Sequence, residues 1–266
     1  MSDANAYSIT VLSKTVHSPT LFSFRTTRPD GFRFEAGQFV RLGVNPSELA
    51  ATPNAADERI FRAYSVVSSP YDEFLEFFSV VVPDGAFTSQ LQHLQVGDVL
   101  YLNPEPFGFL TLSRYQEPAP QDLWLLATGT GLAPFLSILQ DLSAWQNYDS
   151  IVLAYSARTQ AELAYLDKIN ALAKDFGMLV DNPAKFKFVP IVTREAVENC
   201  LGARLPALIA DGALERAAGL TLNPATSHVM LCGNPDMVND TKEALKNKGL
   251  TMNRRSVGNI AVENYW

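Results

Sequence analysis

Residues 123–139 read LWLLATGTGLAPFLSIL, and this stretch decides how the rest of the chain is interpreted. The apolar run 123–127 has the length of a strand buried on both faces, as in a parallel sheet. After the turn TGTG, apolar residues recur at helical spacing, with Pro134 in the first turn, where its missing N–H costs nothing. A strand, a glycine turn and a helix present backbone N–H groups to a phosphate. An ordinary strand–helix connection explains the same residues equally well.

The chain downstream alternates between strand and helix patterns. We predict strands at 123–127, 151–155, 186–192 and 228–232, and helices at 133–145, 160–176, 206–217 and 235–248. This alternation is typical of a doubly wound parallel sheet. The turn is not the dinucleotide-binding fingerprint G-x-G-x-x-G, because only its first two glycines are present.

The chain upstream is rich in β patterns. We predict strands at 7–13, 20–27, 38–44, 62–67, 74–82 and 99–102, with one helix at 88–94. Many short strands with one helix favour a closed antiparallel β-barrel. A polar, Pro-containing stretch separates the two patterns. We therefore predict two domains, a barrel at 1–112 and a doubly wound α/β domain at 123–266, joined by a linker at 113–122.

Composition limits the classes of function. The chain has 266 residues, 47% of them hydrophobic, and a net charge of −7, which argues against general nucleic-acid binding. Its two cysteines, Cys200 and Cys232, are too few for a disulfide framework or a four-thiolate metal site. We see no export signal and no apolar run that spans a membrane. We expect a cytoplasmic protein without a metal site that binds neither nucleic acid nor membranes.

The stretch Arg62-Ala63-Tyr64-Ser65 combines three side chains that suit a flat nucleotide cofactor. An Arg pairs with phosphate, a Tyr ring stacks on a heterocycle, and a Ser bonds to a ring edge. The alternative is an ordinary strand with Tyr64 in the core and Arg62 in solvent.

Three arginines follow predicted strands in the second half. Arg158 and Arg194 come just after strands, and Arg204 lies shortly beyond the second of these. Ligands bind where the carboxyl ends of parallel strands meet. A turn that offers Arg158 in place of a carboxylate suits the extra 2′-phosphate of NADP better than the free ribose of NAD. Scattered solvent arginines are the alternative.

Five motifs occur in an order that resembles a known family. They are R-A-Y-S at 62–65, V-P-D-G at 82–85, G-T-G-L-A-P at 129–134, C-G-N-P at 232–235 and E-N-Y-W at 263–266. Together they resemble the bacterial ferredoxin/flavodoxin–NADP reductases of the subclass that ends in Tyr-Trp, over essentially the whole chain. The resemblance implies an FAD-binding barrel followed by an NADP-binding domain.

The same resemblance implies an activity and its partners. Hydride passes between NADP(H) and FAD, and single electrons pass between FAD and ferredoxin or flavodoxin. One alternative is an NADPH-dependent flavin reductase, or a reductase for another acceptor. Another is a non-catalytic flavin-binding electron-transfer subunit. We expect a monomer that docks its acidic partner near Arg254 and Arg255.

The resemblance also implies the residues around FAD. Arg62 binds the pyrophosphate, Tyr64 stacks on one flavin face, and Ser65 bonds near flavin N5. Tyr265 covers the other face and Trp266 stacks on the adenine. The remaining contacts are Ala63, Phe78, Val80, Ala86, Phe87 and Thr88. Residues 86–88 open a helix directly after a turn, and a helix start of this kind suits phosphate binding apart from the resemblance. Thr88 is also a good helix N-cap, and both roles are compatible.

Residues for NADP are implied in the same way. The glycine turn holds its pyrophosphate, the arginines hold the 2′-phosphate, and Cys232 lies beside the nicotinamide. The expected contacts are Thr128, Gly129, Thr130, Gly131, Arg158, Thr193, Arg194, Arg204, Gly233 and Asn234. Ser65, Cys232 and Glu263 are expected to serve catalysis.

Overall fold

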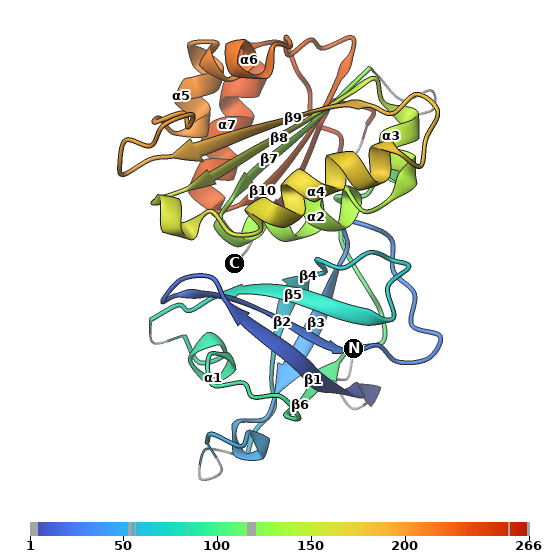
Figure 1. Ribbon diagram of the computed structural model, residues 1–266, viewed down its shortest axis with the longest axis vertical. Helices are drawn as coiled ribbons and strands as arrows, with labels where there is room; N and C mark the ends of the chain where they lie inside the picture. The colour runs from blue at the N-terminus through green and yellow to red at the C-terminus, as the bar shows by residue number, and fades with distance from the viewer. Residues whose placement is uncertain are drawn as a thin grey trace.

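A computed structural model describes residues 5–52, 55, 57–83, 85–115, 121–254 and 256–264. Figure 1 shows two layers of strands, one above the other, with helices of the second half lying between them and beyond. Among the described residues, no helix is long and apolar enough to cross a membrane.

The first half forms an antiparallel sheet of six strands in the order β4-β3-β6-β1-β2-β5. The strands are β1 (Tyr7–Val16), β2 (Leu21–Thr27), β3 (Phe39–Val44), β4 (Ile60–Ser65), β5 (Phe74–Val80) and β6 (Val99–Leu102). A bridge between Val66 and Phe77 brings the two edges together, so the sheet nearly closes. Short helices accompany it: η2 (Pro46–Glu48), α1 (Thr88–Leu91) and η3 (Leu112–Arg114). The predicted barrel is confirmed.

The second half forms a parallel sheet of five strands in the order β11-β10-β7-β8-β9. The strands are β7 (Asp122–Thr128), β8 (Ser150–Ala157), β9 (Lys185–Val192), β10 (Ser227–Gly233) and β11 (Ile260–Asn264). In chain order the sheet starts at β7, runs outward to β9, and then continues on the other side of β7 with β10. The predicted doubly wound sheet is confirmed, and its switch point lies between β7 and β10.

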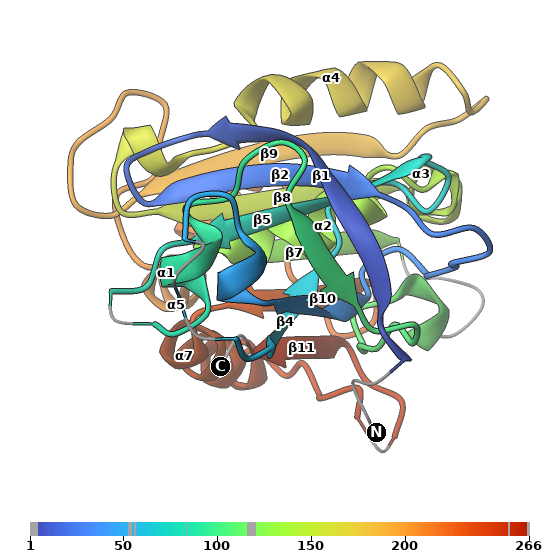
Figure 2. The same ribbon diagram turned by 90° about the horizontal axis from the view of Figure 1, so that it is seen from below.

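Helices cover both faces of this sheet (Figures 1 and 2). One layer packs against Leu123 and Leu125, and the other packs against Trp124 and Leu126, because successive strand residues point to opposite faces. The first layer holds η4 (Gly129–Leu132), α2 (Ala133–Ile138), α3 (Leu142–Asn147), η5 (Gln160–Glu162) and α4 (Leu166–Gly177). The second holds α5 (Leu205–Ala210), α6 (Ala213–Ala218) and α7 (Pro235–Asn247).

Three of the predicted helices begin or break at other residues. The helix predicted at 133–145 breaks before Asp141, whose side chain accepts from Ser143 N at 2.9 Å and so begins α3. The helix predicted at 160–176 starts in regular form only at Leu166. The helix predicted at 206–217 is interrupted by Gly212, which has a φ of 73°. Strand β11 was not predicted.

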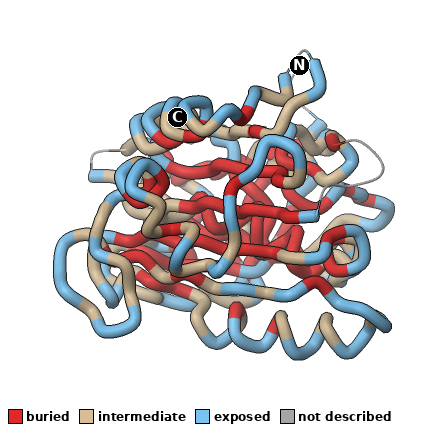
Figure 3. Tube along the Cα trace, turned by 90° about the horizontal axis from the view of Figure 1, so that it is seen from above, coloured by how far each residue is buried: buried red, intermediate tan, exposed pale blue. Residues whose placement is uncertain are grey.

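The barrel packs on the α2–α4 layer through buried polar contacts. Ser137 Oγ donates to the Ser68 carbonyl at 2.8 Å, and Gln140 Nε2 donates to the Val67 carbonyl at 2.7 Å. Both donor side chains are buried, as is Phe78 of the barrel. Figure 3 shows that the buried segments run through the centre of the molecule. Buried polar groups that are fully paired make this contact specific.

Two glycines let the ends of β7 and β10 approach each other. A Cβ on Gly131 would lie 2.3 Å from the Cys232 carbonyl oxygen. A Cβ on Gly233, whose φ is 139°, would lie 2.2 Å from Thr128 Oγ1. The same hydroxyl accepts from Asn234 N at 3.1 Å. The turns TGTG and CGNP therefore interlock at the switch point.

We expect Gly131→Ala to destabilise the fold, because backbone atoms that cannot move aside occupy the space a methyl group needs. The free energy of unfolding in urea should fall by about 2–3 kcal/mol, in the range of overpacked cores. Gly202→Ala is the matched control, since a Cβ there meets nothing within 4 Å. Equal stability of the two variants would contradict the interlock.

Candidate functional site

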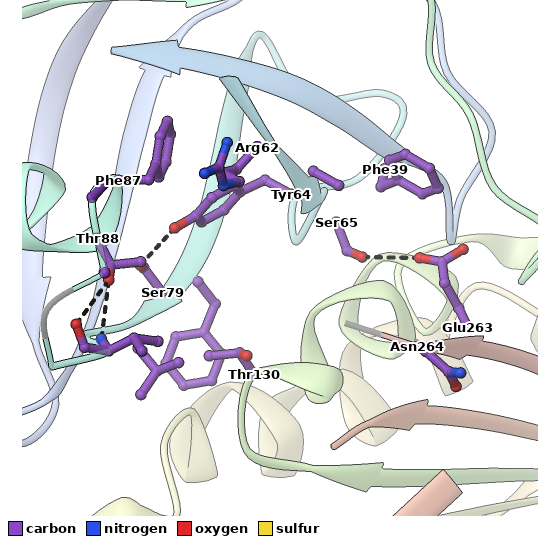
Figure 4. Close-up of a pocket in the computed structure, with 16 residues that line it drawn as sticks. Phe39, Arg62, Tyr64, Ser65, Ser79, Phe87, Thr88, Thr130, Glu263 and Asn264 are labelled. Carbon is purple, nitrogen blue, oxygen red and sulfur yellow. Dashed lines mark hydrogen bonds between the residues drawn. The ribbon is translucent and has the colours of Figure 1, made fainter. Parts of the chain in front are cut away.

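A pocket of about 390 Å³ lies between the barrel and the carboxyl edge of the second sheet (Figure 4). Thr130, after β7, and Glu263 and Asn264, at the end of β11, line it from the second sheet. The barrel supplies the rest of the lining: Phe39, Arg62, Ala63, Tyr64, Ser65, Phe78, Ser79, Val80, Val82, Gly85, Ala86, Phe87 and Thr88. The pocket therefore unites residues that the sequence places far apart.

Strand β4 supplies the motif RAYS to this pocket. Tyr64 is 9% exposed, and its hydroxyl lies 2.9 Å from Ser79 Oγ. Burial raises the pKa of Tyr64 to about 12, so its ring stays neutral. Arg62 and Ala63 are exposed and line the pocket, and Arg62 Nη1 donates to the Phe61 carbonyl at 2.7 Å. Tyr64 thus belongs to the barrel core and to the pocket wall at once.

Ser65 and Glu263 meet across the two domains. Ser65 Oγ donates to Glu263 Oε1 at 3.4 Å, a long contact that joins β4 to β11. Glu263 Oε2 is buried without a hydrogen-bond partner among the described residues. Burial raises the pKa of Glu263 to about 7, although bonds from the Phe109 backbone and Ser65 oppose the shift. This carboxyl therefore changes its protonation state near neutral pH.

Strand β5 forms another wall. Phe78 and Val80 share its outer face, toward the α2–α4 layer, while Ser79 points into the barrel and meets Tyr64. All three line the pocket, as expected for Phe78 and Val80.

The loop before α1 closes the pocket with Ala86, Phe87 and Thr88. Thr88 does not cap the helix: Phe87 is the N-cap residue, and no side chain bonds to the first turn. The Thr88 hydroxyl instead accepts from Val82 N at 3.0 Å and ties the ends of the loop together. The N-cap interpretation is therefore wrong. The phosphate-binding role of this loop stays a prediction.

The glycine turn and the CGNP turn lie at the switch point. Among their residues that the sequence suggested, Thr130 lines the pocket, whereas Thr128, Gly131, Gly233 and Asn234 form the interlock and Gly129 supplies a φ of 53°. Cys232 is fully buried and pairs in register with Glu263 on the neighbouring strand. Its catalytic role stays a prediction.

The arginines follow β8 and β9. Arg194 N donates to the Arg158 carbonyl at 2.9 Å, and Thr193 Oγ1 donates to the Ala157 carbonyl at 3.2 Å, so the two loops lie side by side. Arg158 Nε donates to Glu162 Oε2 at 3.0 Å, and a second guanidinium nitrogen reaches Oε1. Arg204 stands at the start of α5, after the same edge. None of these arginines lines the 390 Å³ pocket.

Five of the described pocket residues were not among the predicted site residues: Phe39, Ser79, Val82, Gly85 and Asn264. Phe39 is the register partner of Ser65, so strand pairing was needed to find it. Val82, Gly85 and Asn264 belong to the motifs V-P-D-G and E-N-Y-W, so these motifs already contained the signal. Tyr265 and Trp266, expected to cover FAD, lie outside the described residues, as does Arg255.

Comparison with known proteins assigns each half separately. Residues 7–105 match a family described as the oxidoreductase FAD-binding domain, and residues 125–243 match the oxidoreductase NAD-binding domain.

Relatives match the whole chain. It is 40% identical to the ferredoxin–NADP reductase of Pseudomonas aeruginosa over 95% of this chain and 93% of that protein. It is 39% identical to the flavodoxin/ferredoxin–NADP reductase of Escherichia coli K12 over 96% of this chain and 93% of that protein. The fold is similar to the crystal structure of a ferredoxin NADP+ reductase from Neisseria gonorrhoeae with bound FAD and NADP. The match covers 99% of this chain and 100% of that chain, with a TM-score of 0.87 and 36% sequence identity. Fold, pocket and sequence therefore agree, and the chain belongs to the family of bacterial ferredoxin/flavodoxin–NADP reductases.

Proposed function

We propose that this chain is an FAD-dependent enzyme that moves electrons between NADP(H) and ferredoxin or flavodoxin. The pocket between the domains carries this proposal, because it brings the RAYS strand of the barrel to Thr130 and Glu263 of the second sheet. An enzyme of this kind needs its two cofactors to meet at one place. The alternatives, a flavin reductase and a non-catalytic subunit, have no specific observation in their favour.

The lining of the pocket fits a flavin. Tyr64 and Phe78 offer aromatic surface for a flat ring, and Arg62 offers charge for a pyrophosphate. Glu263 Oε2 is a buried polar atom that lacks a hydrogen-bond partner among the described residues. A polar edge of a bound flavin ring would supply that partner. FAD, when bound, accepts hydride as a pair of electrons and releases electrons singly, so the protein supplies binding and orientation.

Ser65 and Glu263 would hold a proton at the reacting edge. With a pKa of about 7, Glu263 can donate from Oε2 or accept there under neutral conditions. Ser65 fixes the other oxygen through its hydroxyl. Neither group needs to move far, because both already project into the pocket (Figure 4).

NADP(H) would bind along the carboxyl edge of the second sheet. In this proposal, Arg158, Arg194 and Arg204 receive the 2′-phosphate, and the glycine turn receives the pyrophosphate. Glu162 already holds Arg158 with two side-chain hydrogen bonds, which raise the pKa of the guanidinium and keep it oriented.

An acidic redox partner would dock beside the Glu263 end of the pocket. Arg114 Nη2 donates to the carbonyl oxygens of Asn253 and Arg254, and its guanidinium lies 4.8 Å from the centre of the Phe109 ring. Phe109 is 64% exposed and follows Gly108, which abuts Glu263. The Arg114 guanidinium beside this exposed ring offers local positive charge on a chain of net charge −7. Monomeric state and cytoplasmic location stay predictions.

The proposed function predicts the behaviour of the purified protein. It should carry FAD, be reduced by NADPH, and then reduce flavodoxin or ferredoxin faster than free FAD. Added salt should slow the step with the protein partner, because surface charges are screened. The measurement compares the rates of the three acceptors at low and high salt. Faster reduction of free FAD than of either protein would favour the flavin reductase alternative.

Replacing both Arg158 and Arg194 by Ala should raise the KM for NADPH about tenfold or more, while the KM for NADH stays nearly unchanged. The reason is that charge-assisted bonds to a phosphate each contribute about 1.5–3 kcal/mol. Arg216→Ala, on α6, is the matched control, because this arginine bonds to the Asp211 carbonyl away from the β8–β9 edge. Equal loss for both nucleotides would contradict the assignment.

The buried carboxyl predicts a pH dependence of stability in protein freed of FAD. The pKa of Glu263 is about 7 in the folded chain and near 4.5 when exposed, so the folded state binds more protons between these values. Stability should therefore fall as pH rises from 4.5 to 7, on the order of 1–3 kcal/mol.

Glu263→Gln should remove this part of the pH profile, measured as urea unfolding at pH 5 and pH 7.5. Glu198→Gln is the control, because Glu198 is exposed. If the Glu263→Gln variant keeps the wild-type profile, another group causes the dependence.

A further inference from the structure

Helix α4 contacts the barrel away from the pocket, through the residues at its start. Tyr165 immediately precedes the helix and has a φ of 63°, a region that residues with side chains rarely adopt. Its hydroxyl donates to Glu76 Oε1 at 2.8 Å, and Lys168 Nζ lies 3.9 Å from Glu76 Oε2. Backbone of this kind persists where surrounding contacts fix it.

Glu76 anchors these contacts on strand β5. Its side chain is buried, and its Oε2 also accepts from Arg25 Nε at 3.0 Å on the neighbouring strand β2. Both carboxylate oxygens are therefore satisfied: Oε1 accepts from Tyr165, and Oε2 accepts from Arg25 and lies near Lys168. Loss of the Tyr165 hydroxyl would leave Oε1 buried and short of its donor, which is costly for a charged acceptor.

Phe78 stands between this anchor and the pocket. It lies two residues after Glu76, on the same face of β5, and it lines the pocket. Its ring meets that of Tyr165 edge-on, with centres 5.2 Å apart and planes at 90°, and that of His17 at 5.5 Å and 82°. Tyr165 itself does not line the pocket.

We propose that Tyr165 is a positioning residue for the bound flavin. Held on Glu76, it fixes the ring of Phe78 in the pocket wall and so sets the aromatic surface that the flavin meets. The inference rests on the proposed binding of FAD in this pocket. It adds that the NADP-binding domain, through the start of α4, shapes the surroundings of a cofactor held by the barrel (Figure 1).

The test uses the full-length protein loaded with FAD. Tyr165→Phe keeps the ring and removes its bond to Glu76, so Phe78 loses its fixed neighbour. The visible circular dichroism of the bound FAD should change, and its dissociation constant should rise about threefold to tenfold. Tyr148→Phe is the matched control, because it removes another buried tyrosine hydroxyl, which lies 3.0 Å from His228 Nδ1. This control should lose thermal stability but keep the dichroism and the affinity for FAD.

A second pair of variants asks whether Tyr165 acts through Phe78. In a Phe78→Leu background, Tyr165→Phe should add little to either readout, because the ring it positions is gone. The proposal is overturned if Tyr165→Phe behaves like Tyr148→Phe, or if its effect persists in full without Phe78. Should Tyr165→Phe fail to fold, Glu76→Met removes the same anchor and should produce the same change in dichroism.

Failure of this inference is distinguishable from failure of the proposed function. A wild-type protein that does not bind FAD contradicts the proposed function itself. The positioning role alone is contradicted if the wild-type protein binds FAD and is reduced by NADPH, while the Tyr165→Phe variant keeps the wild-type dichroism and affinity for FAD.

Discussion

The close approach of two turns at the switch point is the constraint on which the site depends. Gly131 and Gly233 have no side chains where Cys232 and Thr128 stand against them, so the ends of β7 and β10 can touch. Because β11 pairs with β10, this contact also fixes the position of Glu263 relative to the turn after β7. A doubly wound sheet leaves a crevice at this point, and here one wall of the crevice is supplied by a second domain.

The barrel reaches that crevice because its contact with the second sheet is specific. Gln140 and Ser137 donate to backbone carbonyls that follow β4, directly after the RAYS strand. A purely apolar contact would allow sliding, whereas each of these buried donors has one acceptor on the barrel within reach. These hydrogen bonds thus fix the position of β4 relative to the switch point. Ser65 can therefore reach Glu263 of the other domain.

Local sequence patterns predict the elements that neighbouring residues alone determine. The run at 123–127 is fully buried on both faces, so its strand could be predicted, and the RAYS motif does line the pocket. Such patterns do not predict contacts that depend on the pairing of distant segments. Phe39 lines the pocket from the strand opposite Ser65, and the helix break before Asp141 accompanies the contact of Gln140 with the barrel. No local pattern shows that Gly108 crowds Glu263 and helps to bury it.

The distribution of charge supports a division of roles within the proposed function. The barrel side of the pocket offers the aromatic surface of Tyr64 and Phe78 beside a single arginine among the described lining residues, Arg62, and burial raises the pKa of Tyr64 to about 12, so that its ring is neutral at physiological pH. The β8–β9 edge, by contrast, holds Arg158 and Arg194 in adjacent loops. A dinucleotide with a charged phosphate end and a nicotinamide end is oriented by such a difference, because its phosphates gain most at the arginines. In the proposed function, its nicotinamide end would then lie toward Thr130 and Glu263, which line the pocket from the second sheet.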